Sequence, residues 1–210
     1  MLSAPVVSRL SLTLAVLAGL ASAAQGGFVV ISQPTAAYLD STTEAVIPSP
    51  GTSVQSLVVG NLTITLSAPM EAASNARLYS LAQSSRTLTF SEPLETFGVE
   101  MSPNLTVFFP APMTAKFFNG DTLLGTINLS VSEYSPRLFA ATDTDTPFTS
   151  VQLSTVPSYF GFPTDGFLIS DVRSQVAAPE PVSLVLFGMG MCGVIGYGWR
   201  RRAGISVPRC

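Results

Sequence analysis

From Phe28 onward, the apolar residues of this 210-residue chain fall into short runs, and no comparable stretch has the 3.6-residue period of an amphipathic helix. The runs are rich in β-branched and aromatic residues and are separated by Pro, Gly, Asn and Ser, which is typical of strands and turns. About ten strands with a turn every ten residues or so predict an all-β fold, specifically a β-sandwich of the jelly-roll type. The predicted strands are Phe28–Ser32, Leu57–Leu66, Arg86–Phe90, Thr96–Met101, Leu105–Phe109, Ala115–Phe118, Thr122–Val131, Arg137–Ala141, Thr149–Ser154 and Gly166–Val172.

Three further segments have a pattern of their own. The sequence Asn119-Gly120-Asp121 between two apolar runs predicts a β-hairpin with a type I′ turn, because Asn-Gly tolerates positive φ values. Gln33–Ser56, with three prolines and many Ser and Thr residues, predicts a long surface loop with one strand at most. Glu71–Ser85 has room for a helical turn or two.

Both ends of the chain have the composition of export signals. Residues 1–9 carry one positive charge, residues 10–20 are mainly apolar, and small residues follow, so we expect a signal peptide over residues 1–24 that is cleaved after Ala23 or Ala24. Near the other end, Val182–Trp199 is a run of eighteen uncharged residues. As a helix this run rises about 27 Å, which predicts a single transmembrane helix across a hydrocarbon core of roughly 30 Å. The next three residues, Arg200, Arg201 and Arg202, hold their end on the cytoplasmic side.

Between these signals, residues 25–178 form one predicted exported domain. This body has no cysteine, histidine or tryptophan, so disulfides, zinc ligands and the usual general bases and thiol nucleophiles are missing, and we expect a non-enzymatic protein. It carries twelve acidic and five basic side chains, a net charge of −7. A field of that sign repels phosphate backbones, so we expect no nucleic-acid partner.

The C-terminal signals occur in a fixed order: the tripeptide Pro179, Glu180 and Pro181, the apolar span, and the arginine cluster. This segment, residues 179–202, resembles a PEP-CTERM sorting signal, and residues 203–210 would be a short cytoplasmic tail. The resemblance implies a Gram-negative bacterium that makes extracellular polysaccharide. It also implies handling by signal peptidase and an exosortase at the inner membrane, a transient anchor there, and delivery to the cell surface or extracellular matrix. More loosely, the strand pattern from Leu57 to Val172 resembles the sandwich body of PEP-CTERM proteins.

Two sets of residues are candidates for ligand binding in the body. Asp143 and Asp145, spaced i, i+2, can converge on a hard cation, and with Asp171 and backbone carbonyls they make a candidate calcium site. An EF-hand is excluded, because the loop lacks the Gly at its sixth position and the Glu at its twelfth. Aromatic residues are candidate platforms for stacking sugars, with core packing as the alternative. They are Tyr134, Phe148, Tyr159, Phe160 and Phe162, the last three within one Gly- and Pro-containing loop.

These observations favour an exported, non-enzymatic β-sandwich with a structural or adhesive function in the extracellular matrix, associated with biofilm and exopolysaccharide. Two alternatives remain open. In one, the body is a carbohydrate- or calcium-binding module of that matrix. In the other, the tail is a permanent single-pass anchor and the body is a receptor-like ectodomain. Since one fold serves many functions, the sequence pattern of the body alone does not choose among them.

Overall fold

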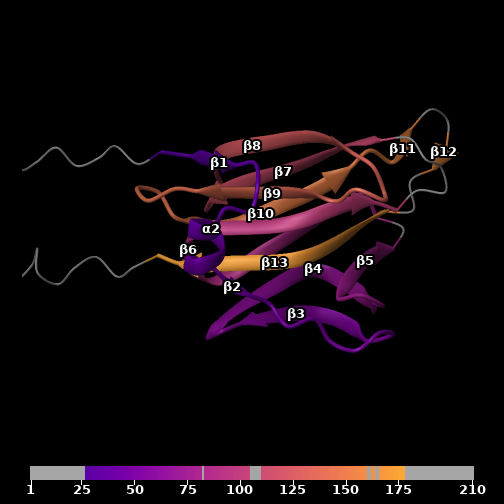
Figure 1. Cartoon of the computed structure of the whole chain (residues 1–210), viewed down its shortest axis with the longest axis horizontal. Coiled ribbons are helices and arrows are strands. Elements are labelled where there is room, and N and C mark those ends of the chain that lie inside the picture. The colour runs from indigo at the N-terminus through magenta and orange to yellow at the C-terminus, as the bar shows by residue number, and fades with distance from the viewer. Residues whose placement is uncertain (1–26, 82, 105–109, 160–161, 164–165, 178–210) are drawn as a thin grey trace, which may run out of the picture. The chain divides into compact units, whose positions relative to one another are not determined.

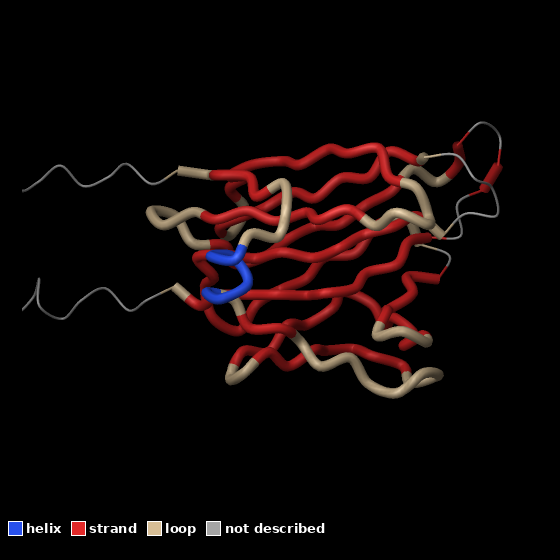
Figure 2. The backbone as a smooth tube through the Cα atoms, in the orientation of Figure 1, coloured by secondary structure: helices blue, strands red, loops and turns tan. Residues whose placement is uncertain are grey.

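The computed structural model describes residues 27–81, 83–104, 110–159, 162–163 and 166–177, and this part of the chain is mostly β-strand, with one short helix (Figures 1 and 2). The predicted all-β class is therefore confirmed. The predicted signal peptide with Ala23 and Ala24, the strand Leu105–Phe109, and the whole of residues 179–210 lie outside the described residues. Among the described residues, no helix is long and apolar enough to cross a membrane. The elements are β1 (Val29–Ile31), α2 (Ala36–Ser41), β2 (Thr43–Glu44), β3 (Ser53–Val59), β4 (Leu62–Ala73), β5 (Arg77–Leu81), β6 (Ser85–Pro103), β7 (Ala111–Asn119), β8 (Thr122–Val131), β9 (Arg137–Thr142), β10 (Phe148–Thr155), β11 (Ser158–Tyr159), β12 (Phe162–Pro163) and β13 (Gly166–Val176).

The long strand β6 belongs to both halves of an eleven-stranded sheet. Its first part, residues 85–90, pairs with β4 and β10, and its second part, residues 94–103, pairs with β9 and β13. β5 in turn pairs with both β4 and β13. The ring of pairings β6, β4, β5 and β13 gives the sheet a barrel-like closure.

The side chains that alternate inward along β6 lie in the main core. Leu88, Phe97 and Met101 are among them, and each is fully buried. Phenylalanines of β7, β9, β10 and β13 pack in the same core as Phe97 of β6, because a large apolar ring removes much surface from water. The fully buried ones are Phe97, Phe117, Phe139, Phe148 and Phe167.

Two predictions between Leu57 and Ser85 were wrong. The single predicted strand Leu57–Leu66 is a hairpin, because Gly60 takes a positive φ of 60° and lets the chain reverse between Val59 and Leu62. The region Glu71–Ser85 contains β5 rather than helical turns, and it reverses at Asn75 and Ala76, which both have positive φ.

The predicted loop Gln33–Ser56 holds more structure than expected. It contains helix α2, strand β2 and the first residues of β3. The helix begins because the Thr35 side chain caps it, accepting a hydrogen bond of 3.2 Å from the backbone N–H of Tyr38. Short helices of this kind lack the apolar periodicity that sequence patterns detect.

The predicted hairpin at Asn119-Gly120-Asp121 is present, since Asn119 of β7 pairs with Thr122 of β8. The turn type was wrong. A type I′ turn needs positive φ at both central residues, whereas in this hairpin only Gly120, at 55°, has one. Gly120 and Asp121 are the two residues between the paired positions.

Both ends of the described body lie in one row of paired residues that runs across neighbouring strands of the sheet. Val29 pairs with Thr142, Thr142 with Thr96, and Thr96 with Gln175, so one row crosses β1, β9, β6 and β13. The Thr96 hydroxyl lies 3.1 Å from the Thr142 hydroxyl and 3.2 Å from the Gln175 side-chain oxygen. Three strand spacings place Val29 and Gln175 about 14 Å apart. The chain therefore enters and leaves the body at one end, as Figure 1 shows for β1 and β13.

Candidate functional site

Asp143, the first residue of the predicted calcium site, organises a turn. It is only 5% exposed, and its carboxylate oxygen accepts hydrogen bonds from the backbone N–H groups of Asp145 (3.1 Å) and Thr146 (2.9 Å). Its own N–H donates to the carbonyl of Glu95 at 2.9 Å. This is the bonding expected of an Asp that caps the connection between two strands, here β9 and β10.

Asp171 lies in a β-bulge of β13. Ser170 pairs with Glu100 and Arg173 with Gly98, so Asp171 and Val172 together face a single residue of β6. Asp171 has a positive φ of 46°, which is rare for a residue other than glycine. Its carboxylate binds the Arg173 Nε at 2.8 Å, and the Arg173 Nη2 binds Glu44 of β2 at 2.6 Å.

The structure does not bring the three predicted aspartates together as a cation site. Among the described residues, no group of three or more Asp, Glu, His or Cys side chains is arranged to hold a metal ion. Asp143 is committed to its turn, and Asp171 is neutralised by Arg173. The sequence spacing of Asp143 and Asp145 thus reflects the turn they form.

Beside this bulge, α2 places Tyr38 against the outer face of the sheet. The ring is 3% exposed and packs with Leu138 and Ala140, while a Cβ at Gly98 would overlap its hydroxyl. Within the described residues this buried hydroxyl has no hydrogen-bond partner. Burial raises the pKa of Tyr38, the Asp171 carboxylate raises it further, and Arg173 opposes them. The phenol therefore stays protonated at neutral pH, which suits a packing contact better than proton transfer.

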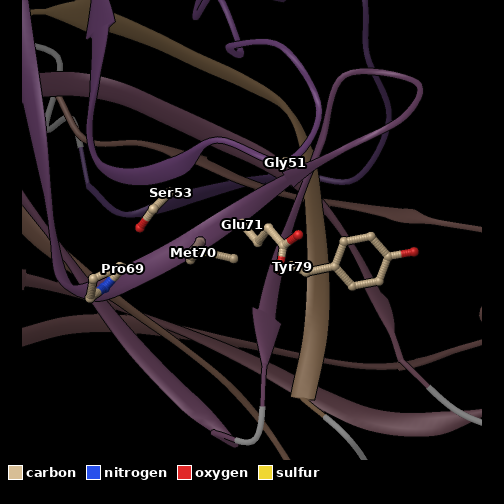
Figure 3. A pocket seen from close by; sticks show the side chains of 6 residues that line it. All are labelled: Gly51, Ser53, Pro69, Met70, Glu71 and Tyr79. Carbon is tan, nitrogen blue, oxygen red and sulfur yellow. The ribbon is translucent and has the colours of Figure 1, made fainter.

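An open groove lies elsewhere on the body, across β3, β4 and β5 (Figure 3). Its volume is about 420 Å³. Ser53 pairs with Glu71, and Glu71 with Tyr79, so these three side chains stand in one row on one face of the sheet. An aromatic face beside carboxylate and hydroxyl groups is suited to a polyol, since the ring packs on C–H groups and the oxygens bind hydroxyls. Gly51, Pro69 and Met70 complete the lining.

The sequence drew attention to other aromatic residues. Phe148 is fully buried against Phe28 and Phe117, so it is a core residue. Tyr134 is 71% exposed and lies outside the groove. Tyr159 and Phe162 pair across a two-stranded sheet, and Phe160 lies outside the described residues.

Sequence reasoning missed Tyr79, although its signal was present. Leu78 and Ser80 are buried on one face of β5, and Tyr79 between them points to the other face. The alternation was overlooked because the strand is only five residues long and lies in a segment expected to be helical.

Comparison with known proteins provides no relative on which to base the assignment. No protein-family model matches the chain, and no curated protein sequence matches it. The candidate site is therefore interpreted from its own residues.

Proposed function

We propose that this chain is an exported, non-enzymatic protein of the cell surface or extracellular matrix, sorted through residues 179–202. In this proposal a signal peptide is removed after Ala23 or Ala24, residues 182–199 anchor the chain transiently in the inner membrane, and an exosortase cuts near Pro179-Glu180-Pro181. The body is a jelly-roll-type sandwich whose two layers are the two halves of the sheet joined by β6. The sequence of the two termini motivates this function.

The observation that carries the proposal is the shared row of Val29 and Gln175. Both processing enzymes act at one membrane, and a body whose two ends leave about 14 Å apart presents both signals to that membrane. Two residues, Ala177 and Ala178, join Val176 to Pro179, and the three Cα–Cα steps between them span at most about 11 Å. The cut site then lies close to the body and to the bilayer. A body with its ends on opposite poles would need a longer linker to do the same.

The sorting function predicts a processing defect when the tripeptide is replaced. Prolines lack the N–H of a helix interior and keep the preceding residue extended, so they hold the cut site open to an enzyme outside the bilayer. Changing Pro179, Glu180 and Pro181 to alanine should make a full-length, membrane-bound species accumulate in the native host. Immunoblotting of membrane and surface fractions measures it.

Two controls test whether the processing defect is specific to the tripeptide and depends on exosortase. Alanine at Gly204, Ile205 and Ser206, beyond the arginines, should leave processing unchanged, and the wild-type chain should accumulate uncut in a host that lacks exosortase. If the alanine variant of the tripeptide is cut and delivered like the wild type, sorting does not depend on it. A wild-type chain that is never cut in its own host points to the permanent-anchor alternative.

A second candidate function, carbohydrate binding, is favoured by the row of Ser53, Glu71 and Tyr79 in the open groove. Loss of one aromatic contact is worth about 1 kcal/mol, which corresponds to roughly a fivefold change in affinity. Tyr79→Ala should weaken binding of a glycan selected on an array by about that factor, measured by calorimetry on the purified body. Tyr79→Phe should keep most of it, because the stacking face remains.

The matched control is Tyr134→Ala, which removes an exposed tyrosine outside the groove. It should bind the glycan like the wild type. Equal losses in the two alanine variants, or no glycan bound by the wild type, would exclude the groove as a sugar site. The sorting proposal is independent of that result.

A further inference from the structure

Arg86 is a buried cation at the start of β6. It is 3% exposed, and it shares the inward face of its strand with Leu88 and Phe90, two and four residues further on. Its partner across the sheet is Leu153 of β10. Arginines are almost never buried to this degree unless their charge is paired.

The guanidinium is only partly satisfied. Its Nη1 donates to the Gln83 side-chain oxygen and, at 3.0 Å, to the Ser85 carbonyl. Its Nε is inaccessible and has no hydrogen-bond partner within the described residues. No carboxylate in that part of the chain forms an ion pair with Arg86, whereas Arg173 has two. Burial lowers the pKa of Arg86, and no anion among the described residues opposes that effect.

Other polar groups near Arg86 are bonded to one another, and none of those described accepts a hydrogen bond from its Nε. The buried Ser80 hydroxyl donates to the Gln83 carbonyl at 3.1 Å, and the Thr155 N–H donates to the Ser84 carbonyl at 2.8 Å. These bonds fix residues 83–85 around the guanidinium. An apolar side chain at this position would avoid the free-energy cost of burying a charge without a counter-ion. An arginine here, with no acidic partner among the described residues, therefore indicates that an anion binds it.

We propose that Arg86 binds a carboxylate, which would take the Nε and Nη2 donors as a side-on pair. Two parallel N–H donors match the two oxygens of a planar carboxylate better than they match a spherical ion. Nη1 is already occupied, and Nε is the donor with no partner. Gln83 is exposed and is hydrogen-bonded to the same guanidinium, so it is the side chain that the ligand displaces to enter. A monoanion would match the single positive charge of Arg86, whose described partners, Gln83 and Ser85, are uncharged.

The test compares thermal unfolding of the purified body, residues 25–178, in sodium galacturonate, acetate, sulfate and chloride at equal ionic strength. The wild-type melting temperature should rise saturably with the carboxylates, by about 5–10 °C at a hundredfold excess over Kd. Arg86→Met should melt higher than the wild type without ligand and should not respond to carboxylate. Arg137→Met, which removes an exposed arginine, should respond like the wild type. A stronger response to galacturonate than to acetate indicates an acidic sugar, and equal responses indicate a small carboxylic acid.

Three results would overturn the site: equal shifts in all four salts, a carboxylate response retained by Arg86→Met, or a response lost in Arg137→Met. If Arg86→Met does not fold, the wild type alone decides the question by nitrogen NMR of the arginine side chains. Titration with galacturonate should move the Arg86 Nε resonance and leave that of Arg137 in place. An unmoved Arg86 resonance rejects the proposal, and neither outcome depends on how the chain is sorted.

Discussion

The Gly166→Ala variant is expected to lose about 4 kcal/mol of unfolding free energy, from a strained backbone together with overpacking. Gly166 begins β13 with a φ of 96°, a conformation that alanine rarely adopts. A Cβ there would overlap the Ser80 carbonyl oxygen and lie 2.9 Å from the Ser80 carbonyl carbon. These are backbone atoms of β5, which cannot rotate away as a side chain can. The pairing of β5 with β13, one link in the closed ring, must shift to make room.

Gly120→Ala is the matched control for this effect. Gly120 also has a positive φ, 55°, but a Cβ there would meet nothing within 4 Å. Its substitution should cost only the left-handed backbone penalty of about 1–2 kcal/mol. Urea unfolding of the two variants at 25 °C measures the difference. If both lose the same free energy, the contact with Ser80 does not constrain the fold.

Alternating patterns predicted those strands whose polar and apolar faces differ. Thr122–Val131 matches β8 at both ends, because the turn that contains Gly120 fixes where the strand begins. The same reasoning failed between Leu57 and Leu66, where apolar residues continue up to Gly60-Asn61 and hide the reversal. The sequence signal for the reversal was the dipeptide Gly60-Asn61, which is typical of two-residue hairpin turns, and Gly60 takes the positive φ of 60°.

The pairing of distant strands was beyond the reach of sequence patterns. The period of two places Arg86 on the same face as Leu88 and Phe90, so an inward arginine was predictable from the strand alone. Its lack of a carboxylate partner depends on which strands surround it. The same holds for the row of Ser53, Glu71 and Tyr79, which three separate segments bring together.

For the aspartates, the sequence pattern predicted a long-range site, whereas among the described residues their carboxylates make only local bonds. Asp143 and Asp145 have a spacing that suits a cation, but an Asp at the start of a turn also has nearby N–H groups to accept. Local backbone donors are always available, whereas a cation site needs further ligands from other strands. The structure therefore gives Asp143 the local bonds, and Asp171 the ion pair with Arg173.

The body has no cysteine, so its stability depends on packing rather than on disulfides. Phe117 lies at the centre of an aromatic cluster, with ring centroids 5.1 Å from Phe148, 5.3 Å from Phe28 and 6.5 Å from Phe97. Phe28 in turn covers Gly125 of β8, where any side chain would overlap its ring. The cluster thus joins Phe28, the residue before β1, to β6, β7 and β10.

Phe117→Ala is expected to cost about 3–5 kcal/mol, through lost burial and the cavity that remains. The free energy of unfolding of a small domain is only about 5–15 kcal/mol in total. This variant should therefore unfold at a much lower urea concentration and lose a large part of its stability. Phe118→Ala is the control, because Phe118 is the next residue of β7, points to the opposite face and is partly exposed. It should lose about 1 kcal/mol or less. Equal losses at the two positions would mean that the ring of Phe117 is not packed in the core, and that β7 is shifted by one residue relative to β8 and β10.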